Sequence, residues 1–376
     1  MSWLGKYFLK AVDFIRYIAY SIGAAFLLLA CGHFLIGLIA IRDSAQLEGL
    51  EEDSSQMREF HRETERAIEV HFEPYYHWKG NPSSGSMVNV DAEGYRKTVK
   101  SSREGAARVF CLGGSTMWGR GVPDQYTIPS MLQAYLGGDY NLHNLGQMAF
   151  VAVQEQNLLL ERLSFGDVPD IAIFYDGVND GYAGAYSPAI PRDPQMVRME
   201  RQMGERWEKG GFFDLLAYGV FAKTNYRYIY DYREAELEEW GARVAPDIEE
   251  NVRKSLDAYE EFVRQVKGIA AVYDFEVFFF WQPNLFSLDK KLTPYELQIL
   301  EAADDVLAES QHAIYWEARK RFVNSEEVVF LGDLFAGVEQ PVYIDFCHVR
   351  PRGNKKIVEA MLQSIQKRMN SGRGEE

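Results

Sequence analysis

Cysteine is scarce in this sequence, and its scarcity excludes several kinds of site. Only three of the 376 residues are cysteines, namely Cys31, Cys111 and Cys347, and no two of them form a CxxC pair. A zinc knuckle or a thioredoxin-type motif requires such a pair, so neither is present. Cys111 and Cys347 fall beside motifs described below. We expect two separate buried thiols there, with a disulfide in an oxidising compartment as the alternative.

Metal-ligand spacing and repeats are also missing. The seven histidines form no HExxH motif and no other ligand spacing, so we expect neither a catalytic metal nor another cofactor. There is no internal repeat and no low-complexity tract. Hydrophobic residues make up 47% and charged residues 25% of the chain, which is typical of a globular protein.

Basic residues are too few to balance the acidic ones. There are 40 lysines and arginines against 55 aspartates and glutamates, and the formal net charge is −15. Residues 1–42 carry four basic side chains and one acidic one, so the excess of acid lies in the rest of the chain. Negative charge of this size repels the phosphate groups of a nucleic acid, so nucleic acid is excluded as a partner.

One long segment has no charge at all. Residues 17–41 form a run of 25 residues without Asp, Glu, Lys or Arg, and about 20 apolar residues suffice to span a bilayer. The apolar core of a signal peptide has only about 7–15 residues, so we expect a retained transmembrane anchor, with cleavage near Ala40 as the alternative. Lys6, Lys10 and Arg16 precede the run and acidic residues follow it. This predicts cytoplasmic residues 1–16 and a periplasmic or extracytoplasmic body.

The remainder divides into a linker, a domain and a short tail. Residues 42–80 are charged with spaced apolar positions, which predicts a stalk that holds the domain off the membrane. We expect the domain at residues 81–370, with an aromatic-rich insertion at about 181–246, and a disordered tail at 371–376.

Strands and helices alternate from residue 108 onward. The apolar runs predict strands at 108–112, 141–145, 170–175, 276–281 and 327–331. Helical patterns fall at 129–136, 152–163, 247–273, 294–322 and 353–369. This order predicts an α/β fold, a three-layer α/β/α sandwich with a mostly parallel five-stranded sheet, preceded by one transmembrane helix.

Four short motifs lie where an open α/β sheet binds its ligands, beyond the carboxyl ends of the strands. They are Gly-Gly-Ser-Thr at 113–116, Asn-Leu-Gly-Gln at 144–147, Gly-Val-Asn-Asp at 177–180 and Asp-Phe-Cys-His at 345–348. Any one of them alone is typical of a turn or a helix cap. Their joint occurrence, in order and after successive strands, favours an active site.

The order and residue types of these motifs resemble the SGNH (GDSL-like) hydrolase superfamily. Its pattern of a GDS-type nucleophile motif, a lone glycine, a GxND motif and a C-terminal DxxH is matched across residues 108–354, and residues 88–96 resemble the lead-in of membrane-anchored bacterial members. One departure is that Gly114 stands where the GDS motif has Asp. The resemblance implies a flavodoxin-like sandwich.

The resemblance also implies a catalytic triad and an oxyanion hole. Ser115 is then the nucleophile, His348 the base that activates it, and Asp345 the carboxylate that orients the imidazole. The oxyanion donors would be the backbone N–H groups of Ser115 and Gly146 and the side-chain amide of Asn179. We expect no cofactor in this mechanism.

Two other motif residues are assigned structural roles. We expect Thr116 to support the turn that carries Ser115, and Asp180 to stabilise its own loop.

These features predict a serine hydrolase acting on carboxylic esters. The expected substrate is an O-acyl ester, above all an O-acetyl group, on a cell-envelope or exported polysaccharide, so the partner is an acylated carbohydrate. Three alternatives remain: an O-acyltransferase that uses the same triad, a lipid esterase, and a non-catalytic partner in envelope assembly.

Overall fold

A computed structural model describes residues 54–99, 102–186, 248–287, 290–303 and 305–372. The described residues from Glu59 onward belong to one compact unit. The predicted cytoplasmic segment, the anchor at 17–41 and nearly all of the predicted insertion lie outside the described residues. None of the helices in the described ranges combines the length and the apolar character that a membrane span requires.

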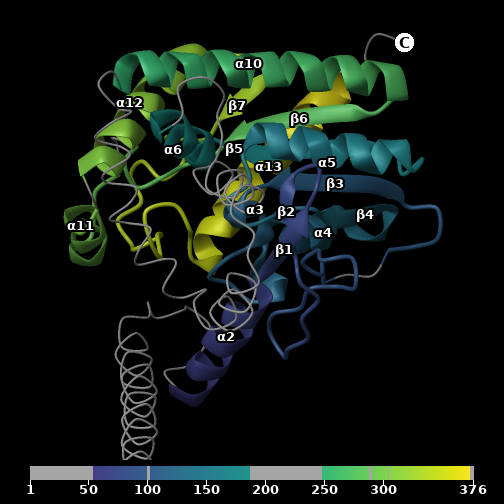
Figure 1. The fold of residues 1–376 in the computed structure, drawn as a ribbon, viewed down its shortest axis with the longest axis horizontal. Helices are drawn as coiled ribbons and strands as arrows, with labels where there is room; N and C mark the ends of the chain where they lie inside the picture. Colours follow the sequence, from purple (N-terminus) through teal and green to yellow (C-terminus); the bar gives the residue numbers. More distant parts are fainter. Residues whose placement is uncertain (1–53, 100–101, 187–247, 288–289, 304, 373–376) are drawn as a thin grey trace, which may run out of the picture. The chain divides into compact units, whose positions relative to one another are not determined.

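A five-stranded parallel sheet forms the centre of the unit, as the alternation of elements predicts (Figure 1). The strand order is β4-β3-β5-β6-β7. The bounds are β3 Ala107–Gly113, β4 Tyr140–Asn144, β5 Ile171–Asp176, β6 Glu276–Trp281 and β7 Val328–Phe330. Because all five strands run in the same direction, the segments that follow them emerge at one edge of the sheet.

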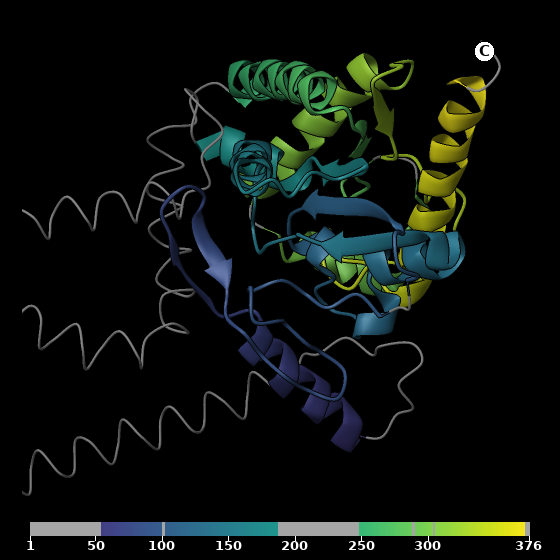
Figure 2. The same cartoon turned by 90° about the vertical axis from the view of Figure 1, so that its right-hand side faces the viewer.

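Helices cover both faces of this sheet, which confirms the three-layer arrangement (Figure 2). Side chains alternate along β5: Ala172 and Phe174 point to one face, while Ile173 and Tyr175 point to the other. The first face packs against α5 (Ala152–Ser164), α10 (Ile248–Tyr273) and α12 (Asp305–Phe322). The second packs against α4 (Ile128–Leu136) and α13 (Pro351–Gly372). Burial on both sides explains why the central strands β5 and β6 are almost entirely apolar, whereas the edge strand β4 is partly polar.

Part of the predicted stalk belongs to the compact unit. Helix α2 (Ser54–Ala67) is followed by an antiparallel hairpin of β1 (Val70–Glu73) and β2 (His77–Gly80). Tyr76 and Trp78 of the hairpin are buried in the same core as α5. The interpretation of residues 42–80 as a linker is therefore corrected for residues 59–80, because buried aromatic side chains tie them to the sheet.

The predicted helix at 294–322 is two helices, α11 (Pro294–Glu301) and α12. The two helices contact different parts of the domain. Glu296 of α11 is fully buried and accepts hydrogen bonds from the backbone N–H groups of Val342 and Tyr343. Helix α12 instead packs on α10. The break between the two helices separates these two sets of contacts.

Two boundaries also differ from the prediction. Helix α6 (Val178–Tyr186) extends into residues assigned to the insertion, and it packs against α10 and α12. Helix α13 extends to Gly372, so the first two residues of the predicted tail are helical.

Candidate active site

The candidate nucleophile lies directly after strand β3. Ser115 is the first residue of a single-turn helix, α3 (Ser115–Trp118), and Gly114 is its N-cap. The Ser115 side chain is nearly buried, with the residue 8% exposed. A residue at a helix N-terminus has a backbone N–H without an intrahelical acceptor, so this turn offers donors beside the hydroxyl.

The structure brings Ser115, His348 and Asp345 together. The Ser115 Oγ lies 2.7 Å from His348 Nε2, and His348 Nδ1 lies 2.7 Å from Asp345 Oδ2. Since a carboxylate only accepts hydrogen bonds, Nδ1 carries the hydrogen and Nε2 is left to accept the hydrogen of the serine hydroxyl. This is the tautomer that a general base requires.

A tight loop presents Asp345 and His348. An antiparallel bridge joins Tyr343 to Val349, and the Ile344 N–H donates to the His348 carbonyl over 2.8 Å. Inside the loop, Asp345 Oδ1 accepts from the backbone N–H groups of Cys347 and His348 at 2.9 and 2.7 Å. Asp345 therefore holds both the backbone and the ring of His348.

Electrostatics keep Asp345 ionised. Removal from water opposes its charge, but the interactions with His348 and then with Arg120 outweigh this effect and lower the pKa of Asp345 below its ordinary value. Asp345 is therefore a carboxylate at neutral pH, which suits it to stabilise an imidazolium next to it.

Asn179 lies beside the nucleophile turn. It is in the first turn of α6, and its Nδ2 donates to the Phe150 carbonyl over 2.8 Å. An amide nitrogen has two hydrogens, so this bond uses one of them and fixes the orientation of the other. A Cβ atom at Gly114 would lie 2.2 Å from Asn179 Nδ2. A side chain at residue 114 would therefore require the Asn179 amide to shift.

Gly146 has a different environment from the one that the resemblance implies. Its N–H donates to Asn144 Oδ1 over 3.1 Å. A Cβ atom there would lie 2.5 Å from the Trp118 nitrogen, so Gly146 packs against the backbone of α3. The structure places Gly146 behind the nucleophile turn with its N–H already paired, and its role as an oxyanion donor stays a prediction.

The loop after Gly146 contains a residue that sequence reasoning did not single out. Ala149 has a φ of 55°, a left-handed backbone that non-glycine residues rarely adopt. It directly precedes Phe150, whose carbonyl orients Asn179. An alanine gives no sequence signal for such a conformation.

The two expected supporting residues make specific contacts. Thr116 Oγ1 donates to Gln282 Oε1 over 2.7 Å, which ties the nucleophile turn to the end of β6. Asp180 Oδ1 accepts from the Ala152 N–H over 3.0 Å, which joins the first turns of α6 and α5. Gln282 follows a strand without any motif around it, so only the structure reveals its part.

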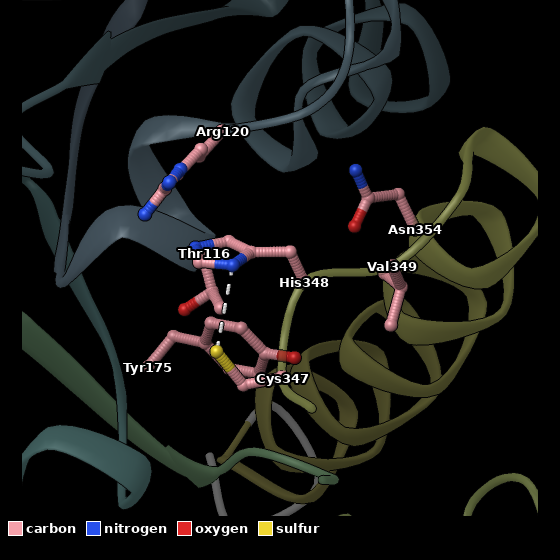
Figure 3. A pocket seen from close by; sticks show the side chains of 7 residues that line it. All are labelled: Thr116, Arg120, Tyr175, Cys347, His348, Val349 and Asn354. Atoms are coloured by element: carbon pink, nitrogen blue, oxygen red, sulfur yellow. Dashed lines mark hydrogen bonds between the residues drawn. The ribbon is translucent and has the colours of Figure 1, made fainter. Parts of the chain in front are cut away.

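A small cavity of about 10 Å³ adjoins His348. Its lining consists of Thr116, Arg120, Tyr175, Cys347, His348, Val349 and Asn354 (Figure 3). A volume of roughly 10–15 Å³ holds one water molecule, so the cavity suits a group of very few atoms. Arg120 adds a positive charge that no motif of the sequence signalled.

Neither of the two described cysteines forms a disulfide, and Cys347 belongs to a group of possible metal ligands. Cys111 and Cys347 are both buried and form no disulfide with each other, which confirms two separate thiols. Donor atoms of Asp345, Cys347 and His348 lie within 4.8 Å of one another, the one such group found in the described part of the chain. A metal ion there would have to displace the hydrogen shared by His348 Nδ1 and Asp345.

Among known proteins, several solved structures are similar to this chain. No family model matches the chain, and no curated protein matches it. A member of the lipolytic G-D-S-L family from Veillonella parvula has 13% identity and a TM-score of 0.34, and the match covers 69% of this chain and 97% of that one. A carbohydrate acetylesterase family member from Sinorhizobium meliloti has 14% identity and a TM-score of 0.35, with coverage of 70% and 98%. An acetyl xylan esterase has 13% identity and a TM-score of 0.35, with coverage of 69% and 99%. Similarities this low do not establish an activity for this chain.

Proposed function

We propose that this chain is a membrane-anchored serine esterase of the SGNH type that hydrolyses O-acyl esters, above all O-acetyl groups on an envelope or exported carbohydrate. The observation that carries the proposal is the continuous contact from Ser115 Oγ through His348 to Asp345, with 2.7 Å at each step. A buried serine, a correctly oriented imidazole and an ionised carboxylate are the groups that acyl transfer through an acyl-enzyme requires.

The geometry supports a two-step mechanism. In the first step, Ser115 Oγ attacks the ester carbonyl carbon while His348 Nε2 takes the hydroxyl proton. The tetrahedral intermediate collapses, the C–O bond to the alcohol breaks, and His348 gives its proton to the leaving alcohol oxygen. In the second step, His348 takes a proton from water, the resulting hydroxide attacks the acyl-serine, and Ser115 leaves with the proton. The products are a free carboxylic acid and the alcohol.

Negative charge develops on the former carbonyl oxygen in both steps. The Ser115 N–H at the start of α3 and the second hydrogen of the Asn179 amide are the donors that the geometry favours for this oxygen. Each preorganised donor of this kind contributes about 2.7–4 kcal/mol to transition-state stabilisation. Gly146 remains a third candidate, provided that its N–H leaves Asn144 or is shared.

The preference for an acetyl group comes from the resemblance to SGNH hydrolases and from the inferred location. The cavity of about 10 Å³ beside His348 has the size of one water molecule and is too small to hold an acyl group. The location outside the membrane rests on the uncharged run at 17–41 and the charges that flank it. An esterase facing the cell envelope would meet acylated carbohydrates there.

The full chain, purified in detergent, provides the test. A fluorophosphonate probe reacts only with an activated serine, so mass spectrometry should find the label on Ser115 and Ser115→Ala should abolish both labelling and hydrolysis of an aryl acetate. Ser164→Ala is the matched control, since Ser164 is exposed and ends α5. Hydrolysis should fall as the acyl group lengthens from acetate to octanoate.

Two outcomes would contradict the proposal. Unchanged hydrolysis in Ser115→Ala would refute the triad. Transfer of the acetyl group to an added glycan, without release of free acetate, would show that a sugar hydroxyl and not water resolves the acyl-enzyme.

A further inference from the structure

Three carboxyl groups are buried together next to the turn that carries Asn179. Glu155 of α5, Asp176 at the end of β5 and Asp180 of α6 are 1%, 4% and 3% exposed. Burial of an ionised carboxylate is strongly unfavourable unless a cation or several donors compensate it. Among the described residues, no ion pair joins any of the three to a lysine, arginine or histidine.

The hydrogen bonds around these carboxyl groups are incomplete if all three are ionised. Asp180 Oδ1 accepts from the Ala152 N–H, and Asp176 Oδ2 accepts from the Tyr259 hydroxyl over 3.1 Å. Both carboxyl oxygens of Glu155 and the remaining oxygen of Asp176 have no donor in the described structure. Glu155 and Asp176 lie within hydrogen-bonding reach of each other. A proton on one of them would complete the bond.

The electrostatics agree with such a shared proton. Burial, reinforced by Asp176 and Asp180, raises the pKa of Glu155 well above its ordinary value. Burial and the charge of Asp180 raise the pKa of Asp176 to about 8, and burial raises the pKa of Asp180 to about 6. The Glu155–Asp176 pair therefore keeps at least one proton at neutral pH.

The other groups that face the cluster within the described part of the chain offer no positive charge. The Tyr259 hydroxyl of α10 donates a hydrogen bond to Asp176. Burial, reinforced by charges that include Asp180, raises the pKa of Tyr315 of α12. Trp281 of β6, which packs edge-to-face on Tyr259, has an indole N–H without a partner in the described structure. Loss of the shared proton would thus add a negative charge that none of the described groups around it neutralises.

This pair joins the two segments that orient Asn179. Residues 150–155 and 176–180 are linked by three contacts, and two of them are the Asn179 amide on the Phe150 carbonyl and the Ala152 N–H on Asp180. The third is the contact of Glu155 with Asp176. Repulsion at the third contact would push the segments apart and move Asn179.

We propose that Glu155 is a positioning residue that, in its protonated form, donates a hydrogen bond to Asp176 and so holds Asn179 in place for the oxyanion. This inference rests on the proposed function, because it assigns the purpose of the pair to transition-state stabilisation by Asn179. It predicts that turnover declines at alkaline pH when the proton leaves, while substrate binding changes little.

The test compares Glu155→Gln, Glu155→Ala and the control Glu161→Gln in the full chain. Glu161 is on the same helix, partly exposed, and accepts from the Tyr76 hydroxyl, which a glutamine can also do. A glutamine at 155 is a donor that has no proton to lose, so kcat of Glu155→Gln for an aryl acetate should be preserved at neutral pH and should decline less at alkaline pH than that of the wild type.

In Glu155→Ala, kcat should fall at least tenfold. The largest expected loss is the roughly 100- to 1000-fold that removal of a whole oxyanion donor causes. KM should stay within about threefold of the wild type. An alkaline decline in Glu155→Gln identical to that of the wild type and of Glu161→Gln would overturn the proposal.

A readout independent of activity separates this inference from the proposed function. Infrared spectroscopy at neutral pH should show the carbonyl band of a buried protonated carboxyl group, weaker in Glu155→Gln than in the wild type and unchanged in Glu161→Gln. Absence of this band in the wild type would refute the shared proton, even for an active enzyme. Its presence in a chain that hydrolyses no ester would leave the proton in place and refute only the catalytic purpose.

Discussion

Replacement of Asp345 by asparagine would change one atom of the triad and little of its shape. The amide oxygen of the new side chain can still accept the backbone N–H groups of Cys347 and His348, as Asp345 Oδ1 does. The amide nitrogen, however, replaces the oxygen that lies 2.7 Å from His348 Nδ1. Because that nitrogen only donates, the imidazole must carry its hydrogen on Nε2, where it can no longer accept the Ser115 proton.

The expected effect is a loss of about 10⁴ in kcat, the magnitude found when a triad carboxylate becomes an amide and the imidazole takes the wrong tautomer. This corresponds to about 5 kcal/mol of transition-state stabilisation. KM for an aryl acetate should change little, because Asp345 touches the imidazole and not the small acyl group. Single-turnover kinetics on the full chain measures the acylation step directly.

Stability provides a second readout of the same variant. Because the pKa of folded Asp345 is below its ordinary value, its contribution to stability is present above about pH 4 and is lost as the pH falls toward the lower folded-state pKa. The free energy of unfolding measured in urea should therefore fall more on acidification for the wild type than for Asp345→Asn. The control is Asp139→Asn, which removes an exposed ion pair with Arg103. An activity loss smaller than tenfold in Asp345→Asn would refute the orienting role of the carboxylate.

Three further variants test other contacts of the site and the fold. Asn179→Ala should lower kcat by about 100- to 1000-fold with little change in KM; an unchanged kcat would remove Asn179 from the oxyanion hole. Gly114→Asp, which restores the Asp of the GDS motif, should lower and not raise activity, because its Cβ would lie 2.2 Å from the Asn179 amide; equal or higher activity would contradict this packing. Asp124→Ala leaves the fully buried Arg96 without its partner at 2.6 Å, so denaturant unfolding should show a loss of about 3–5 kcal/mol, while fluorophosphonate labelling of the folded fraction should persist.

Local sequence patterns determined the order of the elements, and the resemblance to SGNH hydrolases indicated the members of the triad. Period-two and period-3.6 patterns depend on neighbours a few residues apart, so each strand and helix is recognisable by itself. The four motifs fall directly after strands or before the last helix, and parallel strands bring their carboxyl ends to a common edge. This predicts that the motifs share one edge of the sheet, and the resemblance to SGNH hydrolases then pairs Ser115 with His348, although 233 positions separate them.

Contacts between distant segments were decided only by the tertiary structure. The strand order β4-β3-β5-β6-β7, the break between α11 and α12, and the burial of the hairpin depend on packing partners far away in the sequence. The same holds for the N–H of Gly146, which turns to Asn144, and for the neighbouring carboxyl groups of Glu155 and Asp176. A sequence shows that an acidic residue is present, but its charge state depends on how much water and which groups surround it, and folding alone determines both.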